Sequence, residues 1–180
     1  MILPRRSLSL LVALTIGLGA LLSACASAPT PTPAPVPTSA VDASGQPILK
    51  VLNATPTPNP FAGWAVTITR VGRAKTISEP GLISLEAKDV WLILHLQATN
   101  GGQAASVFPR ARLLVVDPAG KQYPVDDNAS EHYSVGVKLP SLDSAIPPKG
   151  KVEVGAVFDV SPTAAGLKLR IGTQDIPIQE

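Results

Sequence analysis

Apolar and polar side chains alternate along short segments throughout residues 61–180. The longest such segment is residues 90–99, in which every even-numbered position is apolar. Its odd-numbered positions begin with the apolar Trp91 and end with the polar Thr99. Because successive side chains point to opposite faces of a strand, this pattern predicts a central strand with one face in a core and the other face partly covered.

Shorter alternating segments predict further strands at residues 64–71, 112–116, 121–123, 151–160, 167–171 and, at a sheet edge, 176–178. Turn sequences separate them, namely Asn100-Gly101-Gly102, Asp117-Pro118-Ala119-Gly120 and Pro147-Pro148-Lys149-Gly150. The second turn, with proline at its first central position, predicts a hairpin between its flanking strands. No window has a convincing helical period. We therefore expect an all-β fold, an antiparallel immunoglobulin-like β-sandwich of about seven strands.

Several motifs of this region follow one another in a characteristic order. They are Gly63-Trp64 at the start of a strand, the run of residues 90–100 ending in Asn-Gly-Gly, Asp117-x-x-Gly120 within residues 113–123, and Pro147-Pro148-Lys149-Gly150 before Val157-Phe158-Asp159-Val160. The succession resembles the telokin-like, immunoglobulin-fold domain of bacterial surface lipoproteins whose function is unassigned. The resemblance covers about residues 61–178. It implies a sandwich behind a lipoprotein leader and a low-complexity linker, and it implies no catalytic residues.

The N-terminus has the three-part layout of a secretory signal peptide. Arg5 and Arg6 precede an apolar run to Leu22, which is shorter than the roughly 20 apolar residues of a comfortable spanning helix. The segment Leu22-Ser23-Ala24-Cys25 resembles a bacterial lipobox, which implies cleavage before Cys25 and attachment of a diacylglyceryl group to its sulfur. We therefore expect residues 1–24 to be a signal peptide. The alternatives are a permanent anchor helix, or ordinary cleavage that leaves a free thiol.

A lipid on Cys25 ties the mature chain to a membrane. Two or more acyl chains bury many methylenes at roughly 0.8 kcal/mol each, so the anchoring is stable. We expect an extracytoplasmic, lipid-anchored protein at the bacterial cell surface. Ala26 follows the cysteine in place of Asp, and by resemblance to diderm lipoproteins nothing there indicates retention at the inner membrane.

Residues 25–60 are rich in Pro, Thr, Ala and Ser. Proline fixes φ and removes backbone donors, so this segment is expected to be a disordered linker with extended polyproline II character. We interpret it as a stalk that lifts the domain from the membrane, the alternative being disordered filler. Residues 48–52 contain four apolar residues and predict either an extra edge strand or an exposed patch in the linker. The folded domain is expected over residues 61–180.

Composition excludes several classes of function. Cys25 is the only cysteine and Met1 the only methionine, so the domain can form no disulfide, thiolate zinc site or blue-copper site. Loss of residues 1–24 leaves 13 basic and 13 acidic residues, and a neutral chain gives no electrostatic case for a nucleic-acid partner. The sequence also lacks a glycine-rich phosphate loop and a serine-nucleophile elbow. We therefore expect no cofactor.

Two pairs of polar neighbours are candidates for chemistry. Glu131 and His132 suggest an acid–base pair, but adjacent residues of an extended segment point apart, so a solvated loop is the preferred interpretation. Asp126 and Asp127 offer oxygen ligands to a hard cation such as Ca²⁺. No Asp-x-Asp-x-Asp-Gly loop follows them, which favours a plain polar loop. No catalytic or metal-binding residue is assigned.

Single residues and two sequons also have both a structural and a functional interpretation. His95 is interpreted as a partly buried structural residue rather than a base. Trp64 and Trp91 lie in apolar strands and are predicted core residues, the alternative being that they stack on a sugar. Asn53-Ala54-Thr55 and Asn128-Ala129-Ser130 match the glycosylation sequon, which we interpret as coincidence in a bacterial lipoprotein.

These observations predict a non-enzymatic binding module that meets a protein or envelope component through a sheet edge or the loops at one end of the sandwich. One alternative is an envelope hydrolase acting on wall glycans or peptides, which requires Glu131, His132, Asp126 or Asp127 to converge in a cleft. Another is an accessory subunit of an envelope complex. The sequence leaves the identity of the partner and the oligomeric state open.

Overall fold

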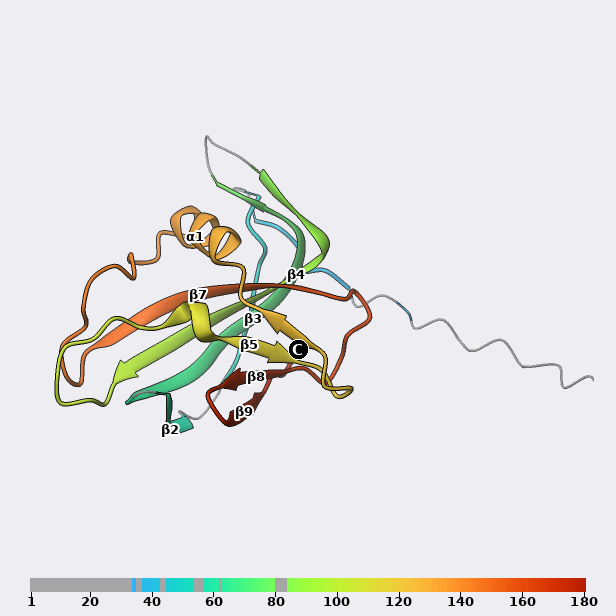
Figure 1. Ribbon diagram of the computed structural model, residues 1–180. Helices are drawn as coiled ribbons and strands as arrows, with labels where there is room; N and C mark the ends of the chain where they lie inside the picture. The colour runs from blue at the N-terminus through green and yellow to red at the C-terminus, as the bar shows by residue number, and fades with distance from the viewer. Residues whose placement is uncertain (1–33, 35–36, 43–44, 54–56, 62, 80–83) are drawn as a thin grey trace, which may run out of the picture. The chain divides into compact units, whose positions relative to one another are not determined.

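The computed structural model describes residues 34, 37–42, 45–53, 57–61, 63–79 and 84–180 (Figure 1). The predicted signal peptide with its lipobox residues Leu22, Ser23 and Ala24, and the predicted lipidation site Cys25, lie outside this part of the chain. No helix within the described residues combines the length and the hydropathy that are needed to cross a bilayer.

The larger of two antiparallel sheets has five strands among the described residues. Its order is β1-β3-β4-β7, and β2 also pairs with β3. These strands are β1 (Lys50–Val51), β2 (Thr57–Phe61), β3 (Trp64–Ser78), β4 (Ser84–Asn100) and β7 (Lys151–Val160). β3 and β4 extend beyond the predicted segments, and a register shift between Ala74 and Thr76 explains why. Such a bulge breaks the two-residue period on which the prediction depends.

The smaller sheet has the order β6-β5-β8-β9. Its strands are β5 (Leu114–Val116), β6 (Gln122–Pro124), β8 (Lys168–Ile171) and β9 (Gln174–Pro177). The hairpin predicted around the Asp-Pro-x-Gly turn is confirmed, because Val115 pairs with Tyr123. The predicted edge strand is confirmed as β9, whose Pro177 needs no ladder hydrogen bond on the open side.

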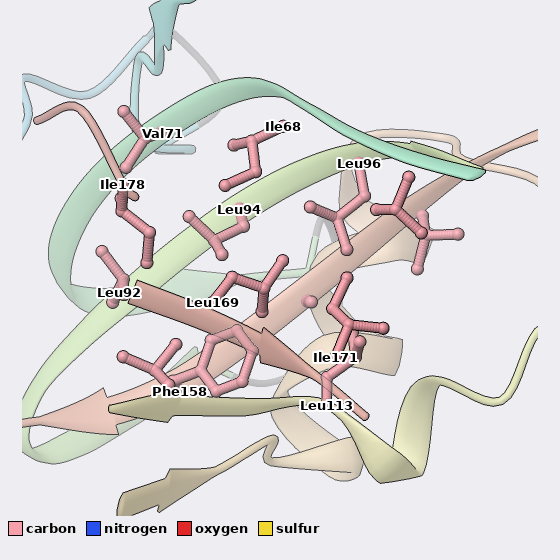
Figure 2. Packing of buried hydrophobic residues seen from close by; sticks show 14 of the residues in the cluster. Ile68, Val71, Leu92, Leu94, Leu96, Leu113, Phe158, Leu169, Ile171 and Ile178 are labelled. Carbon is pink, nitrogen blue, oxygen red and sulfur yellow. The ribbon is translucent and has the colours of Figure 1, made fainter. Parts of the chain in front are cut away.

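The main hydrophobic core lies between the two sheets. Figure 2 shows Leu92, Leu94 and Leu96 of β4 on the same side of their strand, facing Leu169 and Ile171 of β8, and all five are fully buried. These leucines are the even-numbered positions whose burial the alternation predicted. The fold is therefore an antiparallel β-sandwich, as predicted. Among the described residues, seven strands from β3 to β9 fall after residue 61, and β1 and β2 precede them.

A helix interrupts the all-β pattern and corrects one prediction. The polar stretch from Pro124 to Ser134, interpreted as a solvated loop, contains most of α1 (Asp127–Gly136). Asp126 is its N-cap, and its Oδ1 accepts a hydrogen bond of 2.8 Å from the backbone N–H of Ala129. This cap satisfies one of the otherwise unpaired donors of the first turn. A 3-10 turn, η1 (Arg110–Arg112), precedes β5.

The buried face of α1 explains why the helix was missed. It consists of Ala129, Ser130, Tyr133 and Ser134, a helical spacing in which two members are serines. The Ser130 hydroxyl donates to the carbonyl of Asp126 at 2.6 Å, and the Ser134 hydroxyl donates to that of Ser130 at 2.7 Å. Both serine hydroxyl groups donate to backbone carbonyls of the preceding turn, so these polar side chains can be buried with their hydrogen bonds satisfied.

The chain preceding β2 also belongs to the folded unit. Residues 37–42 and 45–52, here called the N-terminal strap, run along β3. The N–H of Ser39 donates to the carbonyl of Arg73 at 2.6 Å, and β1 pairs Lys50 with Val71. The extra edge strand considered for residues 48–52 is therefore present at residues 50–51. The folded unit consequently includes residues that composition alone placed in the linker.

Candidate functional site

The outer face of the larger sheet, turned away from the sandwich core, carries a pocket of about 570 Å³. The sheet forms its floor, while α1, which packs on β7 and β3, and the N-terminal strap form its walls. We call it the outer pocket. It is lined by residues 42 and 46–49 of the strap, residues 133 and 136–139 at the end of α1, and Arg70, His95 and Glu153 of the sheet.

A row of three residues across the strands builds part of the floor. In the strand register Arg70 of β3 pairs with His95 of β4, which pairs with Gly155 of β7. A Cβ atom at Gly155 would lie 2.8 Å from the hydroxyl of Ser134 and 3.1 Å from the ring of Tyr133. Since real Cβ atoms do not approach so closely, glycine at this position allows α1 to settle on the sheet and brings Tyr133 to the pocket.

His95 and Tyr133 form a hydrogen-bonded pair beneath the pocket. The His95 Nε2 and Tyr133 Oη atoms are 2.7 Å apart, and the two rings meet edge to face. Burial, with a smaller contribution from the positive charge of Arg70, lowers the pKa of His95 to about 4. Burial also raises the pKa of Tyr133. Both groups are therefore uncharged at neutral pH and present a neutral, polar surface to a ligand.

Charged side chains of both signs surround this neutral pair. Arg70, Lys138 and Glu153 are exposed, and none of them makes a side-chain hydrogen bond or ion pair with another described residue. Lys138 has a φ of 60°, at the position after the helix end where glycine is usual. A left-handed conformation costs a residue with a Cβ roughly 1–2 kcal/mol. The pocket thus contains charged side chains that have no partner among the described residues. One of them, Lys138, has a left-handed backbone conformation that a lysine does not favour.

Gln46 adds a buried acceptor to the wall of the pocket. Its side chain is 2% exposed, and its Nε2 atom donates to the carbonyl of Ser78. Its Oε1 atom is buried and has no hydrogen-bond partner among the described residues. An acceptor left unpaired in this way costs about 1–3 kcal/mol.

The candidates for acid–base chemistry lie elsewhere and bind separate partners. Glu131 faces Arg110, with 3.4 Å between Oε2 and Nη2. His132 faces Glu79, with 2.6 Å between Nδ1 and Oε2. Neither Glu131 nor His132 lines the outer pocket. The helix places these two adjacent residues against different neighbours, so they do not converge in one cleft.

The two aspartates weighed as calcium ligands have structural contacts at the start of α1. Asp126 caps the helix, and Asp127 forms an ion pair of 3.2 Å with Arg110. The described residues contain no group of three or more His, Cys, Asp or Glu side chains that could hold a metal ion.

The tryptophan predictions are confirmed. Trp64 is buried in the sandwich core and meets the ring of Phe108 edge to face at 5.3 Å. Trp91 is buried on the outer side, in a smaller cluster that includes Ile93 and Tyr133. His95 is buried too, as expected, but it also forms part of the pocket. Of the two sequons, Asn128 is exposed on α1, whereas Thr55 lies outside the described residues.

Sequence reasoning missed four members of the outer pocket, namely Arg70, Lys138, Glu153 and Gln46. Each of these four residues lies in a different segment of the chain. The sequence around each one looks the same as that around any polar surface residue, so nothing local marks it as part of a site. One signal was available: His95 lies where the outer face of β4 changes from apolar to polar. That change marks the place where the covering of the sheet ends.

No family model matches this sequence, and no curated protein matches it. Two solved structures have similar folds. One is a conserved hypothetical protein from Bacillus anthracis, 14% identical, with a TM-score of 0.60 over 73% of this chain and 96% of that chain. The other is an uncharacterized β-sandwich protein from Clostridium difficile 630, 12% identical, with a TM-score of 0.45 over 71% of this chain and 90% of that chain. At 14% identity the first similarity concerns the fold alone, which this chain shares with a bacterial protein.

Proposed function

We propose that this protein is a lipid-anchored, extracytoplasmic binding protein with a telokin-like, immunoglobulin-fold domain, and that its outer pocket meets a protein or envelope component. Acylated Cys25 would hold the chain at a bacterial membrane, and the proline-rich linker would present the domain at the cell surface. The motifs of residues 1–25 and the β-sandwich fold support this assignment.

The single observation that carries the binding role is the outer pocket. Its volume of about 570 Å³ falls within the range of roughly 300–1,000 Å³ that is typical of small-molecule sites. It contains the uncharged His95–Tyr133 pair, the unpaired charges of Arg70 and Glu153, and the buried Oε1 of Gln46. A concave site in which a few polar groups converge is the usual mark of a recognition site.

Binding is favoured over hydrolysis by the contacts of the acidic and imidazole groups. Glu131 and His132 bind Arg110 and Glu79 respectively, so neither is free to serve the other as a base. In the outer pocket, His95 shares its Nε2 with Tyr133. This arrangement is suited to holding a ligand by hydrogen bonds.

The anchor and the site are tested separately, and the anchor is tested on protein extracted from its native membrane. Intact-mass measurement should find a chain that begins at Cys25 and carries acyl groups, and Cys25→Ser should release the protein from the membrane. A chain that retains Met1 and a bare thiol would refute the anchor.

For the site, crosslinking on intact cells should capture a component that the double variant Arg70→Gln, Lys138→Gln no longer captures. The matched control replaces two lysines of the smaller sheet and its turn, by Lys121→Gln and Lys168→Gln. This control variant should capture the same component as the wild type. Equal capture by both double variants would refute the binding role of the pocket. The identity of the captured component would show whether the partner is a free molecule or part of a larger envelope complex.

A further inference from the structure

The outer pocket holds two opposite charges that do not neutralise each other. Arg70 on β3 and Glu153 on β7 are separated by β4, and Glu153 lies two residues before Gly155, which shares the row of Arg70. Strands lie about 4.8 Å apart with about 3.3 Å per residue, which places the two Cα atoms about 12 Å apart. The two side chains form no ion pair across this distance.

A ligand that satisfies both charges must itself carry opposite charges some distance apart. A polyanion such as a nucleotide would be repelled by Glu153 and Asp42, and a simple cation by Arg70 and Lys138. A peptide with free termini has a carboxylate at one end and an ammonium at the other. An extended chain spans at most about 3.3–3.6 Å per residue. A peptide of two or three residues therefore fits between the side chains of Arg70 and Glu153.

The rest of the lining suits the body of such a peptide. The neutral, hydrogen-bonded His95–Tyr133 pair offers polar surface to amide groups. Ile48, which is 56% exposed at the rim, and Leu49 offer apolar surface to small side chains.

We infer that the outer pocket binds a two- or three-residue peptide with free termini, whose carboxylate is held by Arg70 and whose ammonium group is held by Glu153. This inference rests on the proposed binding role and specifies the class of ligand. The peptide backbone lies over His95 and Tyr133, which form part of the pocket lining.

Titration calorimetry of the full mature protein in detergent tests this with three probes: trialanine, its C-terminal amide and its N-acetyl form. Trialanine should bind, and blocking either terminus should weaken binding about tenfold or more, because each block removes a charge-assisted hydrogen bond. Arg70→Gln should weaken trialanine binding and abolish the difference between acid and amide. Glu153→Gln should likewise abolish the difference between free and acetylated amines.

The matched controls Lys168→Gln and Glu86→Gln, both exposed and outside the pocket, should leave both differences intact. The inference is overturned if trialanine fails to bind, if blocked and free termini bind equally, or if Arg70→Gln weakens acid and amide alike. If trialanine fails to bind but the double variant Arg70→Gln, Lys138→Gln still loses its cellular component, the binding role stands and only the peptide assignment falls. Circular dichroism of each variant establishes that it is folded.

Discussion

The two faces of β4 show how one strand serves two purposes. Its even-numbered residues from Val90 to Ala98 are buried against the second sheet without interruption. Its odd-numbered residues begin buried at Trp91 and Ile93, reach the pocket floor at His95, and are only half-buried at Gln97. The inner face is uniform, whereas the outer face changes from packing to recognition within a few residues.

The covering of each face explains this difference. A second sheet of four strands covers the inner face, so the inward side chains of β4 from Val90 to Ala98 are apolar and fill the space between the layers. A ten-residue helix and the N-terminal strap cover the outer face. These two elements meet without closing over the sheet, and the outer pocket lies where they leave polar groups accessible. The comparison therefore separates a face that serves stability from a face that serves both stability and binding.

The largest expected effect comes from removing neighbouring side chains on opposite faces of β4. Leu94→Ala should lower the free energy of unfolding by about 3–5 kcal/mol, since it leaves a cavity in the large core. Ile93→Ala, equally buried but in the smaller outer cluster, should cost about 2–3 kcal/mol, because the helix can relax toward the sheet. Urea unfolding measures both. Equal losses would show that the two faces are equally well packed.

A smaller effect is expected from acid through His95 on the outer face. The unfolded His95 takes up a proton with a pKa of 6.5, whereas the folded one does so only near 4. Protons therefore favour the unfolded state, so stability is full above pH 6.5 and falls as the pH drops toward 4, by up to roughly 3 kcal/mol. The other charged or titratable groups that line the pocket with His95 are Asp42, Arg70, Tyr133, Lys138 and Glu153.

The unfolding free energy measured between pH 7 and pH 4 checks this prediction. His95→Gln should flatten the profile in that range. His132→Gln, which changes the histidine that binds Glu79 outside the pocket, is the control and should retain most of the decline. A profile that His95→Gln leaves unchanged would mean that the decline comes from other groups.

The smallest expected effect concerns the helix that covers the outer face. Asp126→Ala removes the N-cap of α1 and should lower stability by about 1 kcal/mol. Asp127→Ala removes an exposed ion pair with Arg110 and should change stability by less than about 0.5 kcal/mol, since such pairs contribute little. Thermal unfolding of both variants compares them. If Asp126→Ala weakens trialanine binding and Asp127→Ala does not, the N-cap of α1 is needed to position the wall of the outer pocket.

Much of the fold was predictable because its signals are local. The alternation along β4 and β7 and the Asp-Pro-x-Gly turn each specify structure within a few residues, and all three predictions are confirmed. The helix was not predictable in this way, because Ser130 and Ser134 are buried through hydrogen bonds to the helix backbone and look polar in the sequence. In the strap, the edge strand considered at residues 48–52 is present in part, whereas residues 37–42 and 45–47 were assigned to the linker because their hydrogen-bond partners on β3 are distant in sequence.

The sequence by itself determined where most strands of residues 64–177 lie and which face of β4 is buried, because a two-residue period and a turn sequence act over short distances along the chain. The tertiary structure alone decided where Arg70, His95 and Glu153 meet. Strand register brings these residues together from three distant segments, and register depends on how whole faces pack. The outer pocket is thus a product of packing, whereas the sandwich that carries it can be read from local pattern.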